Sequence, residues 1–73
     1  MRHLYKACFV VIDPISKERY KVLSRPIFDQ LSDFLKYVEA IVYGLITHVV
    51  DEYGNEIDLK HVRSIHRVSY FKQ

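Results

Sequence analysis

The chain has 73 residues, of which 49% are hydrophobic and 27% charged, and its formal net charge is +2. A chain of this length and composition forms a single compact domain over residues 1–73 and is unlike a disordered tail. The single cysteine, Cys8, excludes an internal disulfide, and no apolar run approaches the roughly 20 residues of a membrane span, so we expect a soluble cytoplasmic protein.

Two stretches near the start predict a β-hairpin. Residues 4–12 are dense in aromatic and β-branched side chains, residues 19–23 resume an alternating pattern, and residues 13–18 form the connecting loop. Because strand side chains alternate between faces, both faces of the first strand are apolar. A single helix covers only one face of a sheet, so loops and long side chains, a second copy of the chain or a partner protein must cover the other.

A helix is predicted from about Pro26 to Tyr43. Apolar residues recur there at three- and four-residue steps and form one continuous stripe. Ser24 is the expected N-cap, Pro26 lies in the first turn, and Gly44 ends the helix in a left-handed conformation. The stripe contains Ile27, Phe28, Leu31, Phe34, Leu35, Val38, Ile41, Val42 and Leu45.

The last third of the chain predicts a second hairpin and a final strand. Residues 46–50 form a strand, residues 51–56 a polar turn, and residues 56–58 return the chain. Asp58 caps a helical turn at residues 59–62, and residues 64–71 form the last strand. The order β-β-α-β-β predicts an α+β fold with one antiparallel or mixed four-stranded sheet and the helix packed on one face.

Charged residues are sorted into three blocks along the chain. Residues 1–25 carry a net charge of +4, residues 26–58 carry −6, and residues 59–73 carry +4. The acidic block coincides with the predicted helix and second turn, and the basic blocks with predicted strands. If the first and last strands are neighbours, they form one basic surface opposite an acidic one.

The chain lacks the motifs of the common enzyme and metal-binding classes. Its serines have no nucleophile-elbow context, and its two glycines cannot form a phosphate-binding loop. His61 and His66, with His48 and Asp58, give only a weak zinc signal, because structural zinc takes four Cys or His ligands in paired spacings and Cys8 lies in a distant strand. We therefore expect a non-enzymatic protein without a metal or another cofactor.

Basic residues interleaved with aromatic ones predict one binding site, for single-stranded nucleic acid. A sheet uses this pattern to hold phosphates while bases stack on its aromatic rings. The acids of the middle block and the absence of an RNP-type run weigh against this alternative. The residues concerned are Lys6, Arg19, Tyr20, Lys21, Arg67 and Tyr70.

The outer face of the predicted helix gives a second site, for a protein partner, and we favour it. Acidic residues there steer an approaching partner, and exposed tyrosines are enriched in interface hot spots. A face that only keeps the protein soluble is the alternative. The residues concerned are Asp29, Asp33, Tyr37, Glu39 and Tyr43.

Residues 49–65 resemble a sequence pattern found in small proteins encoded by bacteriophages. The pattern is a valine-rich strand, an acidic turn with a glycine, Glu-Ile-Asp-Leu, and then Val-Arg-Ser-Ile. The match covers about a quarter of the chain and is a hairpin signature. The resemblance implies a viral host-takeover protein, a compact non-enzymatic module that binds a large host machine in the host cytoplasm, such as RNA polymerase, and alters or blocks it. It assigns a role to no particular residue.

Overall fold

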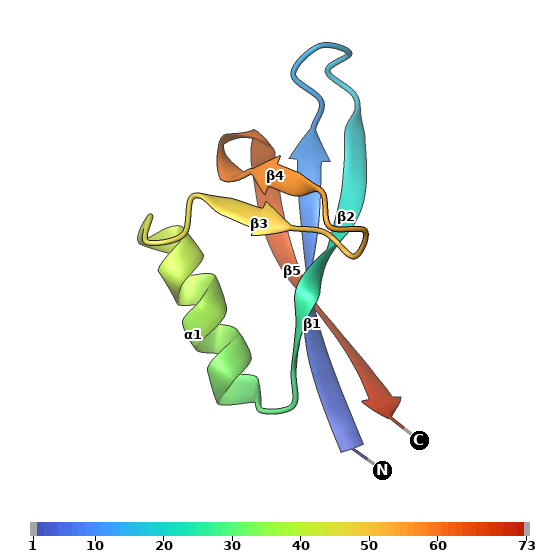
Figure 1. Cartoon of the computed structure of the whole chain (residues 1–73), viewed down its shortest axis with the longest axis vertical. Coiled ribbons are helices and arrows are strands. Elements are labelled where there is room, and N and C mark those ends of the chain that lie inside the picture. Colours follow the sequence, from blue (N-terminus) through green and yellow to red (C-terminus); the bar gives the residue numbers. More distant parts are fainter. Residues whose placement is uncertain (1, 73) are drawn as a thin grey trace.

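The computed structural model describes residues 2–72 (Figure 1). Over these residues the fold is α+β with one α-helix and antiparallel strands, as the sequence predicts. The loop at residues 13–18 and the helical turn capped by Asp58 also lie where they are predicted. The elements are β1 (Arg2–Ile12), β2 (Arg19–Phe28), α1 (Leu31–Val42), β3 (His48–Val50), β4 (Glu56–Asp58), the 3₁₀-helix η1 (Leu59–His61) and β5 (Val62–Lys72).

The strands of the described residues form two sheets, whereas the sequence predicts one with four strands. β2, β1 and β5 form a three-stranded antiparallel sheet in that order, and β3 pairs with β4 in a separate hairpin. A bridge between Ser24 and Asp51 connects the hairpin to the edge of β2. Residues 24–26 of β2 stand opposite Ala7 alone, and Pro26 has no amide hydrogen, so this irregular edge gives β3 no regular ladder to join.

α1 begins at Leu31, five residues later than predicted, and Ser24 is not its N-cap. Residues 26–28 extend β2 instead, and Ile27 and Phe28 pair with β1. Ser24 is fully buried in the sheet, where its Oγ accepts a hydrogen bond from the Ala7 amide at 3.1 Å and its hydroxyl donates to the Pro26 carbonyl at 3.3 Å. The apolar pattern of residues 27 and 28 is compatible with a helix or a strand, and these residues form a strand because they pair with β1.

Replacing Ser24 by alanine is expected to lower the free energy of unfolding by about 1–3 kcal/mol, because the buried Ala7 amide loses its acceptor. Urea unfolding followed by circular dichroism measures this loss. Ser32→Ala, on the exposed side of α1, is the control and is expected to change stability by less than about 0.5 kcal/mol. Equal stability of the two variants would show that the Ser24 hydroxyl is not needed in the sheet.

Gly44 ends α1 as the sequence predicts. It has a φ of 76°, its amide donates to the Ile41 carbonyl at 3.1 Å, and the Leu45 amide donates to the Ala40 carbonyl at 2.9 Å. These two bonds form a Schellman motif, in which a residue with left-handed φ follows the last turn of the helix. The motif turns the chain from α1 toward β3.

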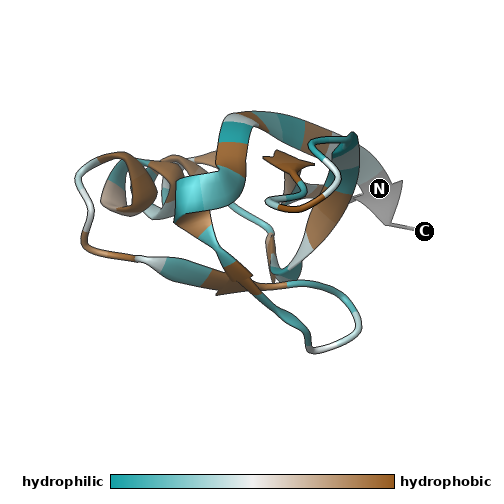
Figure 2. Cartoon of the chain, turned by 90° about the horizontal axis from the view of Figure 1, so that it is seen from above, coloured by the Kyte–Doolittle hydropathy of each residue, from teal (hydrophilic) through white to brown (hydrophobic). Residues whose placement is uncertain are grey.

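The core is small and lies on one side of the three-stranded sheet. Ala7, Phe9 and Val11 of β1 pack against Phe34 of α1 and Val49 of β3, and all five are at most 3% exposed. α1 and the hairpin lie on this side of the sheet (Figure 1). Figure 2 shows apolar positions around much of α1, so the core takes up only part of the helix's apolar surface.

The opposite side of the sheet, here called the open face, has no helix or strand of residues 2–72 lying over it (Figure 1). Side-chain alternation and strand register place alternate residues of all three strands there. Lys6 and Cys8, at its centre, are nonetheless only 8% exposed. The open face contains Leu4, Lys6, Cys8, Val10 and Ile12 of β1, Arg19, Lys21, Leu23 and Ile27 of β2, and Ser64, His66, Val68 and Tyr70 of β5.

The charge blocks are separated in space as well as in sequence. β1 and β5 are neighbours, so both basic blocks contribute to the three-stranded sheet. The acids of the middle block lie on α1, in the residues just before it and in the β3–β4 hairpin. The protein therefore has a basic sheet and acidic elements packed on one side of it.

Candidate protein-interaction surface

Three apolar residues of α1 are exposed together. Leu31, Leu35 and Val42 are 36%, 53% and 72% exposed. At 100° per residue, the three side chains fall within about 40° of the helix circumference. They form an apolar strip along one side of the helix, which we name the α1 flank.

The way α1 packs explains why this strip stays exposed. Phe34 is buried at the centre of the packed side, with Tyr5 and Phe28 rings at 6.4 and 6.2 Å from its own. Tyr37 lies on the β2 side of the helix, where its ring is 5.2 Å from that of Phe28. The α1 flank lies on the other side of Phe34 and is therefore turned away from β2. At its C-terminal end, Val42 lines a groove together with Val62 and Ile65 of β5.

A hollow adjoins the C-terminal end of the flank. It has a volume of about 420 Å³ and is floored by Ile41, Ile46 and Leu59. Asp58 and Lys60 lie at its rim, with their Oδ2 and Nζ atoms 3.6 Å apart. A hydrogen bond from the Lys60 amide is the main cause that holds the pKa of Asp58 below its usual value, so this rim carries a stable carboxylate. An apolar floor with a charged rim suits one apolar side chain of a partner.

The residues predicted for protein binding do not form one face. Asp33 and Glu39 are exposed but lie about 120° apart around α1. The prediction that Tyr37 is an exposed anchor is wrong, because its ring packs on Phe28, and burial raises the pKa of its hydroxyl. Tyr43, directly after α1, is 71% exposed, and Asp29 precedes the helix. Of this set, Glu39 borders the α1 flank.

The residues predicted for nucleic-acid binding lie on both faces of the sheet. Arg19, Lys21 and Tyr70 share the open face with Lys6, whereas Tyr20 and Arg67 lie on the opposite side. The Arg67 guanidinium lies over the Tyr5 ring, 5.8 Å from its centroid. The set is therefore divided, and no single strand of nucleic acid contacts all of it on one surface.

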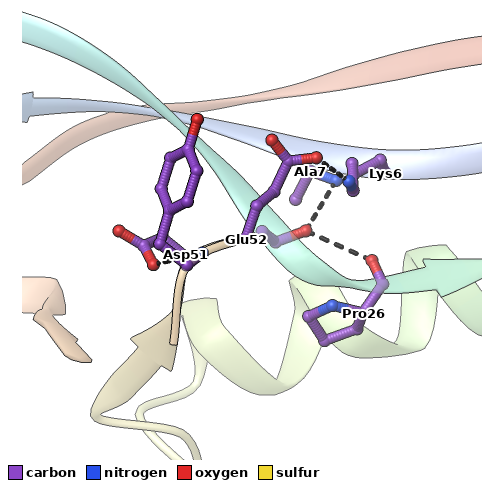
Figure 3. Close-up of polar contacts among 7 residues, drawn as sticks. Lys6, Ala7, Pro26, Asp51 and Glu52 are labelled. Atoms are coloured by element: carbon purple, nitrogen blue, oxygen red, sulfur yellow. Dashed lines mark hydrogen bonds and ion pairs between the residues drawn. The ribbon is translucent and has the colours of Figure 1, made fainter. Parts of the chain in front are cut away.

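Lys6 is occupied by an ion pair that ties the hairpin to the sheet. The side chain of Glu52, in the turn between β3 and β4, extends across β2 to the Lys6 ammonium (Figure 3). The Lys6 side chain is 10% exposed and that of Glu52 is 40% exposed. A buried ammonium needs such a partner, so this pair is structural.

The Lys6–Glu52 pair gives a two-variant prediction. Glu52→Gln is expected to cost about 1–3 kcal/mol of stability, since it leaves the Lys6 charge buried without a carboxylate. Lys6→Met removes the charge and keeps the side-chain volume, so we expect it to change stability by less than about 1 kcal/mol. Thermal unfolding of both variants at one pH tests whether Glu52→Gln is the more destabilising substitution. A larger loss of stability in Lys6→Met than in Glu52→Gln would contradict this prediction.

Asp51 organises the turn that carries Glu52. Its Oδ1 accepts hydrogen bonds from the amides of Tyr53 at 2.9 Å and Asn55 at 2.8 Å, and its Oδ2 accepts one from the Asn55 side chain at 3.2 Å. Desolvation is the largest single influence and raises the pKa of Asp51. The hydrogen bonds together outweigh it and hold the pKa below the usual 3.8.

The lowered pKa of Asp51 predicts a pH dependence. Because the folded-state pKa lies below the unfolded one, its stabilisation is fully present above about pH 4 and is lost as the pH falls through the folded pKa. Asp51→Asn is expected to lower stability at neutral pH and to weaken the decline of stability below about pH 4. Urea unfolding at several pH values, with exposed Glu56→Gln as control, measures both effects. If the stability of Asp51→Asn declined below about pH 4 as steeply as that of the wild type, Asp51 would not be the source of this pH dependence.

The histidines considered for zinc do not converge. His48 Nε2 lies 3.9 Å from Asp58 Oδ2, whereas His66 Nε2 lies 3.0 Å from Ser64 Oγ on the open face. Within the described part of the chain, no group of three or more His, Cys, Asp or Glu side chains is arranged to hold a metal ion. Residues 2–72 also contain no helix with the length and hydrophobicity needed to cross a bilayer.

None of the protein-family models, curated proteins and solved structures compared with this chain matches it. Its function is therefore inferred from its own residues. The α1 flank was not predicted as a site, although the sequence contains a signal for it. The apolar stripe, with Tyr37, spans about 160° of the helix, which is wider than the roughly 100° that packing on one small sheet needs.

Proposed function

We propose that this protein is a non-enzymatic protein-binding module that uses the α1 flank and the adjoining hollow. The observation that carries the proposal is the joint exposure of Leu31, Leu35 and Val42, continued by Leu45, which is 80% exposed. Monomeric soluble proteins rarely expose apolar side chains in such a contiguous strip, and strips of this kind mark interaction surfaces. The apolar floor of the hollow offers a place for an anchoring side chain.

Charge supports the same proposal. Glu39 borders the flank, and Asp58 and Lys60 lie at the rim of the hollow, so an apolar centre is surrounded by charged groups. This arrangement matches the apolar centre and polar rim of protein interfaces. The separation of acidic elements from a basic sheet also orients the protein as it approaches a charged partner.

The resemblance of residues 49–65 to phage host-takeover proteins supports a particular kind of partner. A small module without an active site acts by occupying a surface of a larger assembly. Under this proposal the partner is a large host machine, and RNA polymerase is the first one to test. Residues 49–65 cover most of the hairpin, η1 and the start of β5, and Asp58, Leu59 and Lys60 of this stretch line the hollow next to α1.

Mass spectrometry of the proteins that a tagged form of the chain retains from lysate, with and without nuclease, tests the proposed function. We expect the same partner to be retained in both conditions. Loss of every retained protein after nuclease treatment would mean that they are retained through nucleic acid, and this result would contradict the proposal.

Single-stranded nucleic-acid binding is the second candidate function, and the grouping of Arg19, Lys21 and Tyr70 on the open face supports it. Its contacts would be electrostatic and salt-sensitive. Titration of single-stranded and duplex oligonucleotides at low salt separates the two candidates. We expect no salt-sensitive binding; affinity that Arg19→Glu and Lys21→Glu together abolish would favour this second function.

A further inference from the structure

The apolar side chains along the α1 flank have the spacing of a helix that packs against a second helix. Leu31, Leu35, Val38 and Val42 follow one another at steps of four, three and four residues, and we call these four residues the α1 seam. This alternation lets one helix present a continuous apolar line to another helix. Val38 is partly buried against the core, and the exposure of the other three rises from 36% at Leu31 to 72% at Val42. The surface therefore fits a helix.

The α1 seam is complementary to itself when two copies of the helix run antiparallel. Around a twofold axis that passes between residues 36 and 37 of both helices, Leu31 packs on Val42 of the second copy, and Leu35 packs on Val38. Each of these pairs forms twice, so every residue of the seam has an apolar partner. The groove of about 200 Å³ beside Val42 then lies next to Leu31 of the second copy. α1 lies at the periphery of the molecule, where a second helix can approach it (Figure 1).

The charged residues beside the seam also favour a second copy. Glu39 borders the seam on its solvent side, Lys36 lies further around the helix, and within residues 2–72 neither forms an ion pair. In the antiparallel arrangement, Glu39 faces Lys36 and Ser32 of the second copy. Asp33 lies on the opposite side of α1, so no two like charges are opposed across the axis. In a parallel pair, Glu39 would instead lie beside Phe34 of the second copy, without a cation.

We propose that the free protein forms an antiparallel dimer in which the α1 seams of two copies cover each other. Only four apolar side chains of each copy take part, so the interface is small, and we expect a weak dimer with a dissociation constant on the order of 100 μM. This inference goes beyond the proposed function and does not depend on it. The two share the α1 flank, so a partner protein binds by replacing the second copy.

Sedimentation velocity over a range of concentrations around this value measures the association of the full chain. We expect a monomer–dimer equilibrium, and in ¹⁵N spectra we expect the amide signals of residues 31–42 to shift with concentration while those of residues 19–23 stay unchanged. A chain that stays monomeric up to about ten times the expected dissociation constant would overturn the proposal. If that monomeric chain still needs the α1 flank to retain a partner, the protein-binding function remains intact.

Leu35→Asp and Lys21→Gln are a matched pair of variants, because each changes the net charge by −1. Leu35→Asp places a carboxylate in the middle of the seam and is expected to weaken the dimer by about tenfold or more. Lys21 is exposed on β2, away from the seam, so Lys21→Gln is expected to leave the dimer unchanged. Equal weakening by the two variants would mean that net charge governs association and would overturn the assignment to α1.

Reversal of charge at Ser32 tests the antiparallel arrangement. Ser32→Lys places a cation opposite Glu39 of the second copy and is expected to strengthen the dimer by about threefold, whereas Ser32→Glu is expected to weaken it by a similar factor. In a Glu39→Lys background the two effects are expected to change sign. A variant that merely folds less well does not produce this reversal. Effects of unchanged sign in the Glu39→Lys background would overturn the arrangement.

Disulfide trapping gives a second test of the orientation, in a Cys8→Ala background so that no other thiol is present. One copy carries Leu35→Cys and the other carries Val38→Cys, and the two are mixed and oxidised. Because residues 35 and 38 face each other across the axis, the mixed disulfide is expected to exceed each disulfide between identical copies by about tenfold. A preference for disulfides between identical positions would indicate a parallel pair and would overturn the proposal.

Discussion

Phe34→Ala is expected to cost about 3–5 kcal/mol of stability, the largest loss from a single substitution in α1. Phe34 is 3% exposed, is the buried residue of the helix, and contacts the rings of Tyr5 and Phe28. A domain of 73 residues has a total stability of about 4–11 kcal/mol, so the substitution removes a large share of it. Thermal and urea unfolding of the purified variant measure the loss.

Leu35→Ala is the matched control, because it truncates the next residue of the same helix. Leu35 is 53% exposed, so we expect its truncation to cost less than about 1 kcal/mol. The ratio of the two losses reports which side of α1 packs on the sheet. A loss in Leu35→Ala as large as that in Phe34→Ala would contradict the placement of the flank at the surface.

The local elements of the fold could be predicted because their signals are local. Asp13 to Glu18 as a loop, Gly44 as the end of α1, and Asp58 as the cap of η1 each depend on a few neighbouring residues. The start of α1 could not be predicted in this way. Ser24 has the chemistry of an N-cap, but its hydroxyl is used by the Ala7 amide, 17 residues away.

The division into two sheets has a similar long-range cause. The β3 pattern predicts a strand, but which strand it pairs with depends on the edge of β2, where residues 24–26 bulge opposite Ala7. The candidate site was missed for a related reason. Apolar residues at helical spacing predict an amphipathic helix, but the width of the sheet that it covers decides how many of them are buried. In this protein the sheet does not cover Leu35 and Val42, and both side chains remain exposed.

Replacing Leu35 and Val42 together by aspartate is expected to weaken partner binding by about 100-fold or more, the largest functional effect in the protein. Both side chains are more than half exposed, so their contacts become important only when a partner covers them. We expect the variant to stay folded, with a spectrum and melting curve close to those of the wild type. Titration calorimetry against the captured partner measures the effect.

Ser32→Asp with Lys36→Gln is the control for charge. It makes the same change of −2 on the same helix, but on the side opposite Phe34. We expect it to bind the partner within about threefold of the wild type. If both double variants lose binding equally, added negative charge is the cause, and the flank has no specific role.

Hydrogen exchange of the protein with and without its captured partner tests most directly where the partner binds. The proposed function predicts slower exchange in residues 31–45 and around the hollow at residues 58–61, with residues 19–23 of β2 unchanged. Protection confined to residues 19–23 and the open face, with α1 exchanging as in the free protein, would contradict it.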